Sequence, residues 1–257
     1  MGKVIVIANQ KGGVGKTTTA VNLSACLGDA GKKVLVIDID PQGNTTSGLG
    51  VSKEDGENSI YEVLVNGESL EDAIVKTDYK NLSVCPANVN LAGAEIEMVD
   101  IEKREHLLDS AIDKIRNKYD FIIIDCPPSL GLLTLNAFVA ADSVLVPIQC
   151  EYYALEGLSQ LTKTIKNIKH TWNEKVQFEG ILLTMFDGRT NLSIQVADEV
   201  KKFFPDKVFK TVIPRNVRIA EAPSFGEPII IYDKYSKGAE SYIELAKEVI
   251  KNNRGWK

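Results

Sequence analysis

One glycine-rich segment near the N-terminus constrains the fold more than any other part of the chain. It runs from Gln10 to Thr18 and reads Gln-Lys-Gly-Gly-Val-Gly-Lys-Thr-Thr. The apolar run before it, residues 3–8, is short enough for a buried parallel strand. Residues 16–29 after it carry Ala and Leu at helical spacing. Strand, glycine-rich turn and helix in this order are typical of a phosphate-binding loop.

Such a loop supplies the groups that a nucleoside triphosphate and Mg²⁺ require. Backbone N–H groups converge on the phosphates, Lys16 reaches the β- and γ-phosphate oxygens, and the Thr17 hydroxyl ligates Mg²⁺ directly. The strict pattern places a glycine where this chain has Gln10. Lys11 has no evident task within one subunit and indicates a second subunit. The sequence thus predicts that the phosphates are bound by Lys11, Gly12, Gly13, Val14, Gly15, Lys16, Thr17 and Thr18.

Apolar runs alternate with helical patterns along the whole chain. We expect strands at residues 3–8, 33–37, 82–85, 121–124, 143–147, 179–184 and 208–212, and helices at residues 16–29, 106–117, 131–140, 156–168, 193–203 and 239–251. Such alternation predicts an α/β fold, a mostly parallel twisted sheet with helices on both faces. The length of the chain and its lack of linker-like segments predict a single domain over residues 1–257. Ligands of such sheets bind at the carboxyl ends of the strands.

Three aspartates follow expected strands at that edge. Asp38 and Asp40 are separated by one residue after one strand, so both side chains are expected on the same face, and Asp125 ends another strand. We expect Asp125 to reach Mg²⁺ through water, as in other phosphate-loop enzymes. Asp38 is expected to support the metal's water shell or the loop, and Asp40 to orient the water that attacks the γ-phosphate.

Composition excludes several classes of protein. The longest apolar stretches are far too short to span a bilayer, and the N-terminus does not resemble a signal peptide. The four cysteines show no paired spacing, which favours a reducing cytoplasm over a disulfide framework or a zinc site. Residues 1–159 carry 13 Lys/Arg and 23 Asp/Glu, whereas residues 160–257 carry 17 and 12. This asymmetry fits either a polyanion-binding surface in the C-terminal part or ordinary solvated helix faces.

Three motifs together carry a family resemblance. The segments Lys11-Gly-Gly-Val-Gly-Lys-Thr-Thr18, Asp38-Ile-Asp-Pro-Gln-Gly-Asn44 and Ile124-Asp-Cys-Pro-Pro-Ser129 resemble the deviant Walker A, A′ and B motifs of the ParA/MinD ATPases. The segments at residues 149–157 and 214–218 look like those of the Soj/ParA chromosome-partitioning branch. Gln10 is usual in that branch, and the similarity runs nearly from end to end.

The resemblance implies tasks for residues that spacing alone leaves unassigned. In such proteins the lysine that corresponds to Lys11 crosses a dimer interface to the partner's ATP, so a homodimer forms only with ATP bound. Pro214 and Asn216 are implied to contact the adenine. An ATPase of this kind uses ATP and Mg²⁺ as its substrate and cofactor, with Lys11, Lys16 and Asp40 taking part in catalysis. Because this lysine comes from the second subunit, hydrolysis would depend on formation of the dimer.

The same resemblance implies a nucleic-acid partner and a cellular process. Arg189 and Arg218 match positions that Soj-type dimers use to bind double-stranded DNA without sequence preference. Two subunits joined by ATP double the phosphate contacts, so dimerisation can switch DNA affinity. A ParB-type centromere-binding protein with a basic N-terminal peptide is the implied activator of a slow ATPase. Chromosome or plasmid partitioning on the nucleoid is the implied process, and a replication initiator is a further implied partner. An N-terminal helix-turn-helix domain is not expected.

Three alternatives use the same scaffold. A MinD-like membrane-associated positioning ATPase needs a C-terminal amphipathic helix, and Asn252, Asn253 and Gly255 are poor helix formers there. An iron–sulfur reductase needs interface cysteines, whereas Cys126 and Cys150 are expected to be buried structural thiols. A biosynthetic ligase needs an acid-substrate pocket, for which no residue cluster is evident.

Overall fold

A twisted, mostly parallel sheet forms the centre of the molecule. The computed structural model describes residues 1–52 and 58–256. In sheet order, the seven strands are β3 (Val75–Lys76), β4 (Leu82–Cys85), β2 (Val34–Asp38), β5 (Phe121–Asp125), β1 (Lys3–Ile7), β6 (Ser143–Gln149) and β7 (Gln177–Thr184). Only the β3–β4 pair is antiparallel among these pairings. The α/β class predicted from the sequence is confirmed.

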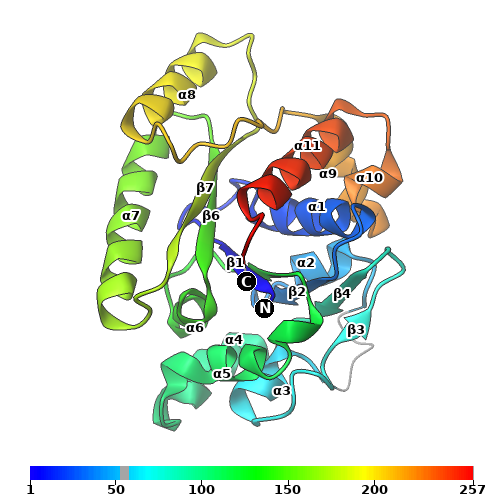
Figure 1. Ribbon diagram of the computed structural model, residues 1–257, viewed down its shortest axis with the longest axis vertical. Coiled ribbons are helices and arrows are strands. Elements are labelled where there is room, and N and C mark those ends of the chain that lie inside the picture. The colour runs from blue at the N-terminus through cyan, green and yellow to red at the C-terminus, as the bar shows by residue number, and fades with distance from the viewer. Residues whose placement is uncertain (53–57, 257) are drawn as a thin grey trace.

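Helices cover both faces of the sheet (Figure 1). One face packs against α1 (Lys16–Asp29), α10 (Ile229–Tyr232) and α11 (Lys237–Asn252), with α2 (Asn44–Gly48) and α9 (Val217–Glu221) nearby. The other packs against α3 (Ile60–Val65), α4 (Leu91–Glu97), α5 (Leu107–Asp113), α6 (Leu132–Ala140), α7 (Ala154–Thr171) and α8 (Asn191–Phe203). The 3₁₀ helices are η1 (Met98–Asp100), η2 (Arg104–His106), η3 (Arg116–Lys118) and η4 (Ala222–Phe225).

The two faces of the sheet follow from the alternation of side chains along each strand. In β1, Val4 and Val6 belong to one apolar cluster, while Ile5 and Ile7 belong to the other. Because both clusters are fully covered, the central strands are apolar throughout rather than alternating with polar residues. β1 lies between β5 and β6, so the loop that follows Ile7 opens at the middle of the carboxyl edge.

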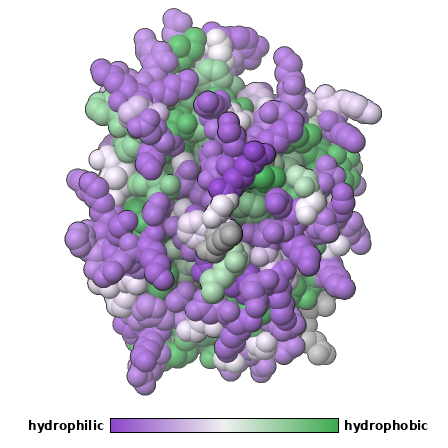
Figure 2. Space-filling view, in the orientation of Figure 1, coloured by the Kyte–Doolittle hydropathy of each residue, from purple (hydrophilic) through white to green (hydrophobic). Residues whose placement is uncertain are grey.

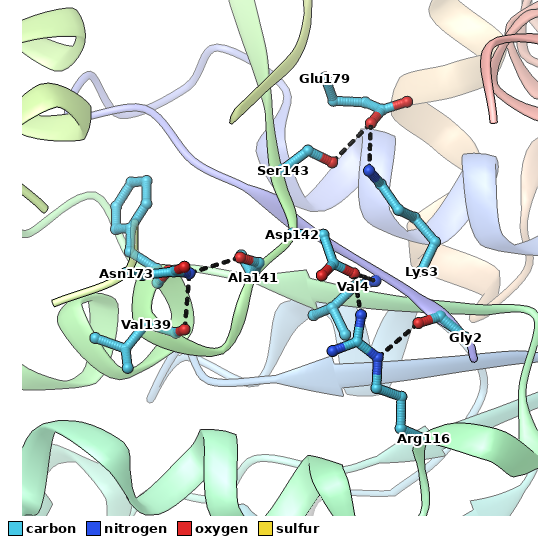
Figure 3. Close-up of polar contacts among 11 residues, drawn as sticks. Gly2, Lys3, Val4, Arg116, Val139, Ala141, Asp142, Ser143, Asn173 and Glu179 are labelled. Carbon is cyan, nitrogen blue, oxygen red and sulfur yellow. Dashed lines mark hydrogen bonds and ion pairs between the residues drawn. The ribbon is translucent and has the colours of Figure 1, made fainter. Parts of the chain in front are cut away.

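Buried ion pairs close the opposite, amino-terminal edge of the sheet (Figure 3). The Arg116 guanidinium pairs with Asp142, whose carboxylate also accepts the Val4 N–H at 2.7 Å. Lys3 lies 3.7 Å from Glu179, which also accepts the Ser143 hydroxyl. These contacts join β1, β6 and β7 through charged groups that are each partnered, as buried charges require.

The expected strand at residues 208–212 is wrong. Isolated parallel bridges join Ile181 to Val208 and Phe186 to Pro214, but no regular strand forms here. The backbone N–H groups of residues 210 and 211 donate to the Glu248 carboxylate of α11 instead of a neighbouring strand, at 2.8 and 3.0 Å. The Glu248 side chain, distant in sequence, therefore takes the place of the neighbouring strand that these N–H groups would need to form a regular strand.

The outer surface is largely hydrophilic on the face shown in Figure 2. Within the described residues, no helix combines the length and apolar character needed to cross a membrane. The four cysteines are all buried with free thiols, as expected for structural cysteines. Burial raises the pKa of Cys150 to about 11, so this thiol stays protonated at neutral pH.

Two helical glycines provide a matched test of packing. An ideal Cβ at Gly28 of α1 would lie 2.3 Å from the Lys80 carbonyl oxygen, whereas one at Gly157 of α7 meets nothing within 4 Å. Gly28→Ala should lower the free energy of unfolding by about 1–3 kcal/mol through overpacking. Gly157→Ala should raise it by about 0.5–1 kcal/mol through helix propensity. Urea unfolding of both variants measures this, and equal effects would contradict the packing assigned to Gly28.

Candidate nucleotide site

The loop after β1 has the conformation of a phosphate-binding turn. Gly13 and Gly15 adopt positive φ values of 73° and 88°, which side chains other than glycine rarely accept. Gly15 directly precedes α1, so the first N–H groups of that helix face the loop. The Val14 carbonyl accepts a hydrogen bond from the Thr184 hydroxyl at the end of β7, at 2.8 Å. The loop is thus anchored to the sheet on its far side.

Lys16 lies inside this loop rather than in solvent. Its side chain is largely buried, and its ammonium donates to the Lys11 carbonyl at 3.3 Å. Burial lowers the pKa of Lys16, while Asp125 and Asp40 act in the opposite direction by stabilising its charge. A lysine held by the loop backbone and facing two carboxylates is placed to meet phosphate oxygens. Its predicted role as a phosphate ligand stays a prediction.

Asp125 ends β5 as a fully buried carboxylate. One oxygen, Oδ2, accepts the Thr17 hydroxyl at 2.8 Å and the Thr45 hydroxyl at 2.7 Å. The other, Oδ1, is buried with no hydrogen-bond partner among the described residues. Burial, reinforced by the Asp38 charge, raises the pKa of Asp125 to about 7. A cation near Thr17 and Asp125 would satisfy this oxygen, so these residues fit Mg²⁺.

Asp38 and Asp40 lie together at the end of β2. The Asp38 carboxylate accepts both the N–H and the hydroxyl of Thr46 at 2.8 Å. Burial raises the pKa of Asp38 to about 6. Asp40 is 8% exposed, and its carboxylate accepts the Gln42 N–H at 2.9 Å. The three predicted aspartates are therefore gathered at one edge. Within the described residues, no three His, Cys, Asp or Glu side chains converge as direct metal ligands.

Lys11 has a partner within its own subunit. Its ammonium lies 2.8 Å from Glu151, which follows β6, and both side chains are partly exposed. The Lys11 N–H donates to the Asn9 side chain at 3.0 Å, and Asn9 in turn donates to the Pro147 carbonyl at 2.8 Å. The lysine thus stands at the outer rim of the loop, away from the buried position of Lys16.

A cavity of about 440 Å³ adjoins the loop on the side of α9. Gly15 and Thr18 line it together with Pro214 and Asn216, the two residues expected at the adenine. Ile213, Ile219 and Tyr242 provide apolar walls. The Asn216 side chain also accepts the Ile219 N–H at 3.4 Å and so begins α9. The volume and lining suit a flat heteroaromatic ring beside a phosphate site.

The two arginines expected at DNA lie on adjacent segments of the surface. Phe186 pairs with Pro214, and the Arg215 N–H donates to the Phe186 carbonyl at 3.0 Å. Arg189 is 88% exposed in its side chain and is paired with Asp187 through two hydrogen bonds of 2.8 and 2.7 Å. Arg218 lies 3.0 Å from Glu221 and 3.5 Å from Asp233. Each arginine is thus held by acidic neighbours.

Several site residues escaped the sequence reasoning. Thr45 and Thr46 support Asp125 and Asp38, Glu151 holds Lys11, and Thr184 anchors the loop. Thr45 and Thr46 directly follow the segment that ends at Asn44, and short polar side chains there could have suggested a helix that presents hydroxyls to the carboxylates. Thr184 gives no sequence signal, because its partner is 170 positions away.

Comparisons with known proteins cover most or all of the chain. A family model described as an AAA domain matches residues 2–178. The chain is 61% identical over 252 residues to the sporulation initiation inhibitor protein Soj of Bacillus subtilis, covering 98% of this chain and 100% of that protein. It is 54% identical over 253 residues to the chromosome partitioning protein ParA of Myxococcus xanthus, covering 98% and 89%. The structure of cobyrinic acid a,c-diamide synthase from Mycobacterium smegmatis with bound ADP and magnesium has a TM-score of 0.87 at 37% identity, covering 100% of this chain and 97% of that chain.

The raised pKa values predict how stability depends on pH without metal or nucleotide. The pKa of Asp125 rises from 3.8 to about 7 on folding, so between these values the folded chain binds more protons than the unfolded chain. The free energy of unfolding should therefore fall as pH rises from 5 to 7, by about 1–3 kcal/mol in total. Asp125→Asn should flatten this slope. Urea unfolding in EDTA at several pH values measures it, and an unchanged slope would remove Asp125 as its cause.

Proposed function

Because the chain belongs to the Soj/ParA family of chromosome-partitioning ATPases, we propose that it works as an ATP-closed homodimer that binds DNA and releases it after hydrolysis. The observation that carries this proposal is the arrangement of two lysines around one glycine-rich loop. Lys16 is buried inside the loop, while Lys11 stands at its rim. One lysine serves its own nucleotide, and the other is free to serve a partner's after leaving Glu151.

The chain uses ATP with Mg²⁺ as cofactor. Bound Mg²⁺ would be held by Thr17 directly and by Asp125, Asp38 and Asp40 through water, and it supplies positive charge to the phosphates. Lys16 and the N–H groups of the loop bind and orient the phosphates. Pro214 and Asn216 hold the adenine in the cavity beside Gly15.

Hydrolysis depends on positioning more than on proton abstraction. Asp40 is mostly buried at the end of β2, where its carboxylate can orient a water molecule toward the γ-phosphate. Lys11 of the second subunit adds positive charge where negative charge accumulates in the transition state. The lone chain therefore turns over slowly.

DNA binding follows from assembly. Arg189 and Arg218 lie on segments joined by the Phe186–Pro214 bridge, three residues after Phe186 and four after Pro214. Two subunits closed by ATP present four arginines, and each additional phosphate contact steepens the salt dependence of binding. These contacts are made to phosphates and not to base edges. We therefore expect binding to double-stranded DNA without sequence preference.

The process we assign is chromosome or plasmid partitioning on the nucleoid, in the cytoplasm. A ParB-type partner accelerates hydrolysis and so releases the DNA, and a replication initiator is a second partner of the ATP dimer. Residues 1–257 act as one ParA-like domain. The synthase activity named for the Mycobacterium smegmatis structure is a weaker candidate for this chain, because its identity of 37% is well below the 61% shared with Soj.

Arg218→Glu should abolish ATP-dependent DNA binding and leave dimerisation intact, because the arginine lies on the surface of α9 outside the loop. Gel retardation with arbitrary double-stranded DNA measures binding, and light scattering with ATP measures dimerisation. Lys114→Glu, with the same charge change at the exposed end of α5, is the control and should bind DNA normally. Two variants of the loop, Lys11→Ala and Gly12→Val, should lose both DNA binding and dimerisation. DNA binding retained by Arg218→Glu would overturn the assigned surface.

Asp40→Ala should hold the chain as an ATP dimer on DNA, because water is no longer oriented for attack. We expect hydrolysis to fall by about 100-fold or more, with ATP binding preserved. Phosphate release and the lifetime of the DNA complex are the measurements. Normal turnover in this variant would exclude Asp40 from the role.

A further inference from the structure

An apolar groove lies apart from the nucleotide site, between α4, η1 and η2 on one side and α7 on the other. Its volume is about 520 Å³, and the exposed side of α6 forms its floor. The apolar lining comes from Val99, Leu130, Leu132, Leu135, Phe138 and Ile168. Figure 1 shows α6 between α4 and α7, so the groove crosses segments that are distant in the sequence.

The rim of the groove is both apolar and acidic. Val99 is 51% exposed and Leu130 is 46% exposed, although both are large hydrophobic side chains. Residues 95–105, which form this rim, contain five Asp or Glu and two Lys or Arg, and of these Glu95, Arg104 and Glu105 line the groove itself. One of the two cations, Arg104, lies 3.3 Å from Glu105 and so adds little free positive charge. Exposed apolar side chains on a segment of net negative charge suit contact with an amphipathic, basic ligand.

The groove is connected to the nucleotide loop by a hydrogen bond. Thr164 of α7 lines the groove, and its hydroxyl accepts the Gln10 side-chain amide at 3.4 Å. Gln10 directly precedes Lys11. On the floor, the Thr134 hydroxyl donates to the Ser129 carbonyl at 2.7 Å, in the segment that follows β5. A ligand in the groove would therefore touch residues that support both sides of the candidate site.

We propose that this groove binds a short basic amphipathic helix of the activating partner, and that Thr164 and Gln10 transmit its docking to the nucleotide loop. The inference rests on the proposed function, in which such a partner accelerates hydrolysis. Apolar side chains spaced by three or four residues fill a groove of this kind, and basic side chains meet the rim. DNA and anionic lipid are disfavoured occupants because the rim is acidic, and a second copy would place like charges together.

Binding is tested on the full chain with a non-hydrolysable ATP analogue and a labelled synthetic peptide of the partner's basic N-terminal segment. Val99→Lys should weaken peptide binding by about tenfold or more, because it adds a like charge and removes an apolar contact. Val89→Lys is the matched control: it is 74% exposed and lies outside the groove lining. This control should bind like the unaltered chain. Equal affinity of the two variants, measured by fluorescence anisotropy, would overturn the docking site.

Coupling is tested by Thr164→Val, which preserves the shape of the groove and removes the hydroxyl that Gln10 contacts. Peptide affinity and basal ATP hydrolysis should stay within about twofold, while acceleration by the peptide should be lost. Full acceleration in this variant would overturn the transmission route. If the peptide fails to accelerate the unaltered chain, the partner in the proposed function is wrong and the docking inference falls with it. If acceleration persists in Val99→Lys, only the docking inference fails.

Discussion

The buried carboxylate of Asp125 is the interaction on which the rest of the site depends. It ends the strand that lies between β1 and β2, so it sits beside both the glycine-rich loop and the segment that carries Asp38 and Asp40. Its Oδ2 atom joins Thr17 at the start of α1 to Thr45 in α2. One oxygen thus fixes two helices, while Oδ1 has no hydrogen-bond partner in the part of the chain that the structure describes. The parallel strand order creates this meeting point, since it brings strand ends distant in sequence to one edge.

The sequence revealed the parts of this site that local patterns encode. The glycines, Lys16 and Thr17 follow directly from a short motif between a strand and a helix, and the aspartates from apolar runs that end in an acid. The pattern at residues 208–212 misled because a strand needs ladder partners, and Glu248 takes two of its N–H groups. Glu151 and Thr184 could not be foreseen for a related reason. Their partners lie 140 and 170 positions away, and no local period records such contacts.

The three cations assigned to other molecules are all held by acidic neighbours in the single chain. Lys11 pairs with Glu151, Arg189 with Asp187, and Arg218 with Glu221. Exposed ion pairs of this kind contribute little to stability, because water and salt screen them. Each can therefore be exchanged for a phosphate without unfolding the segment that carries it. In the proposed cycle, Asp187 and Glu221 keep these two arginines paired in the lone chain.

The two lysines of the loop differ in whether they can exchange partners. Lys16 cannot leave its place, because it is buried and its charge is stabilised by Asp125 and Asp40. Lys11 can leave, because its pair with Glu151 is partly exposed and lies at the rim. In the proposed cycle, a nucleotide bound by one chain contacts Lys16 and leaves Lys11 on Glu151. A second nucleotide-bound chain would offer Lys11 a phosphate that carries more negative charge than a single carboxylate. Under this proposal, assembly is favoured only when both chains hold a nucleotide, which is the condition that a switch requires.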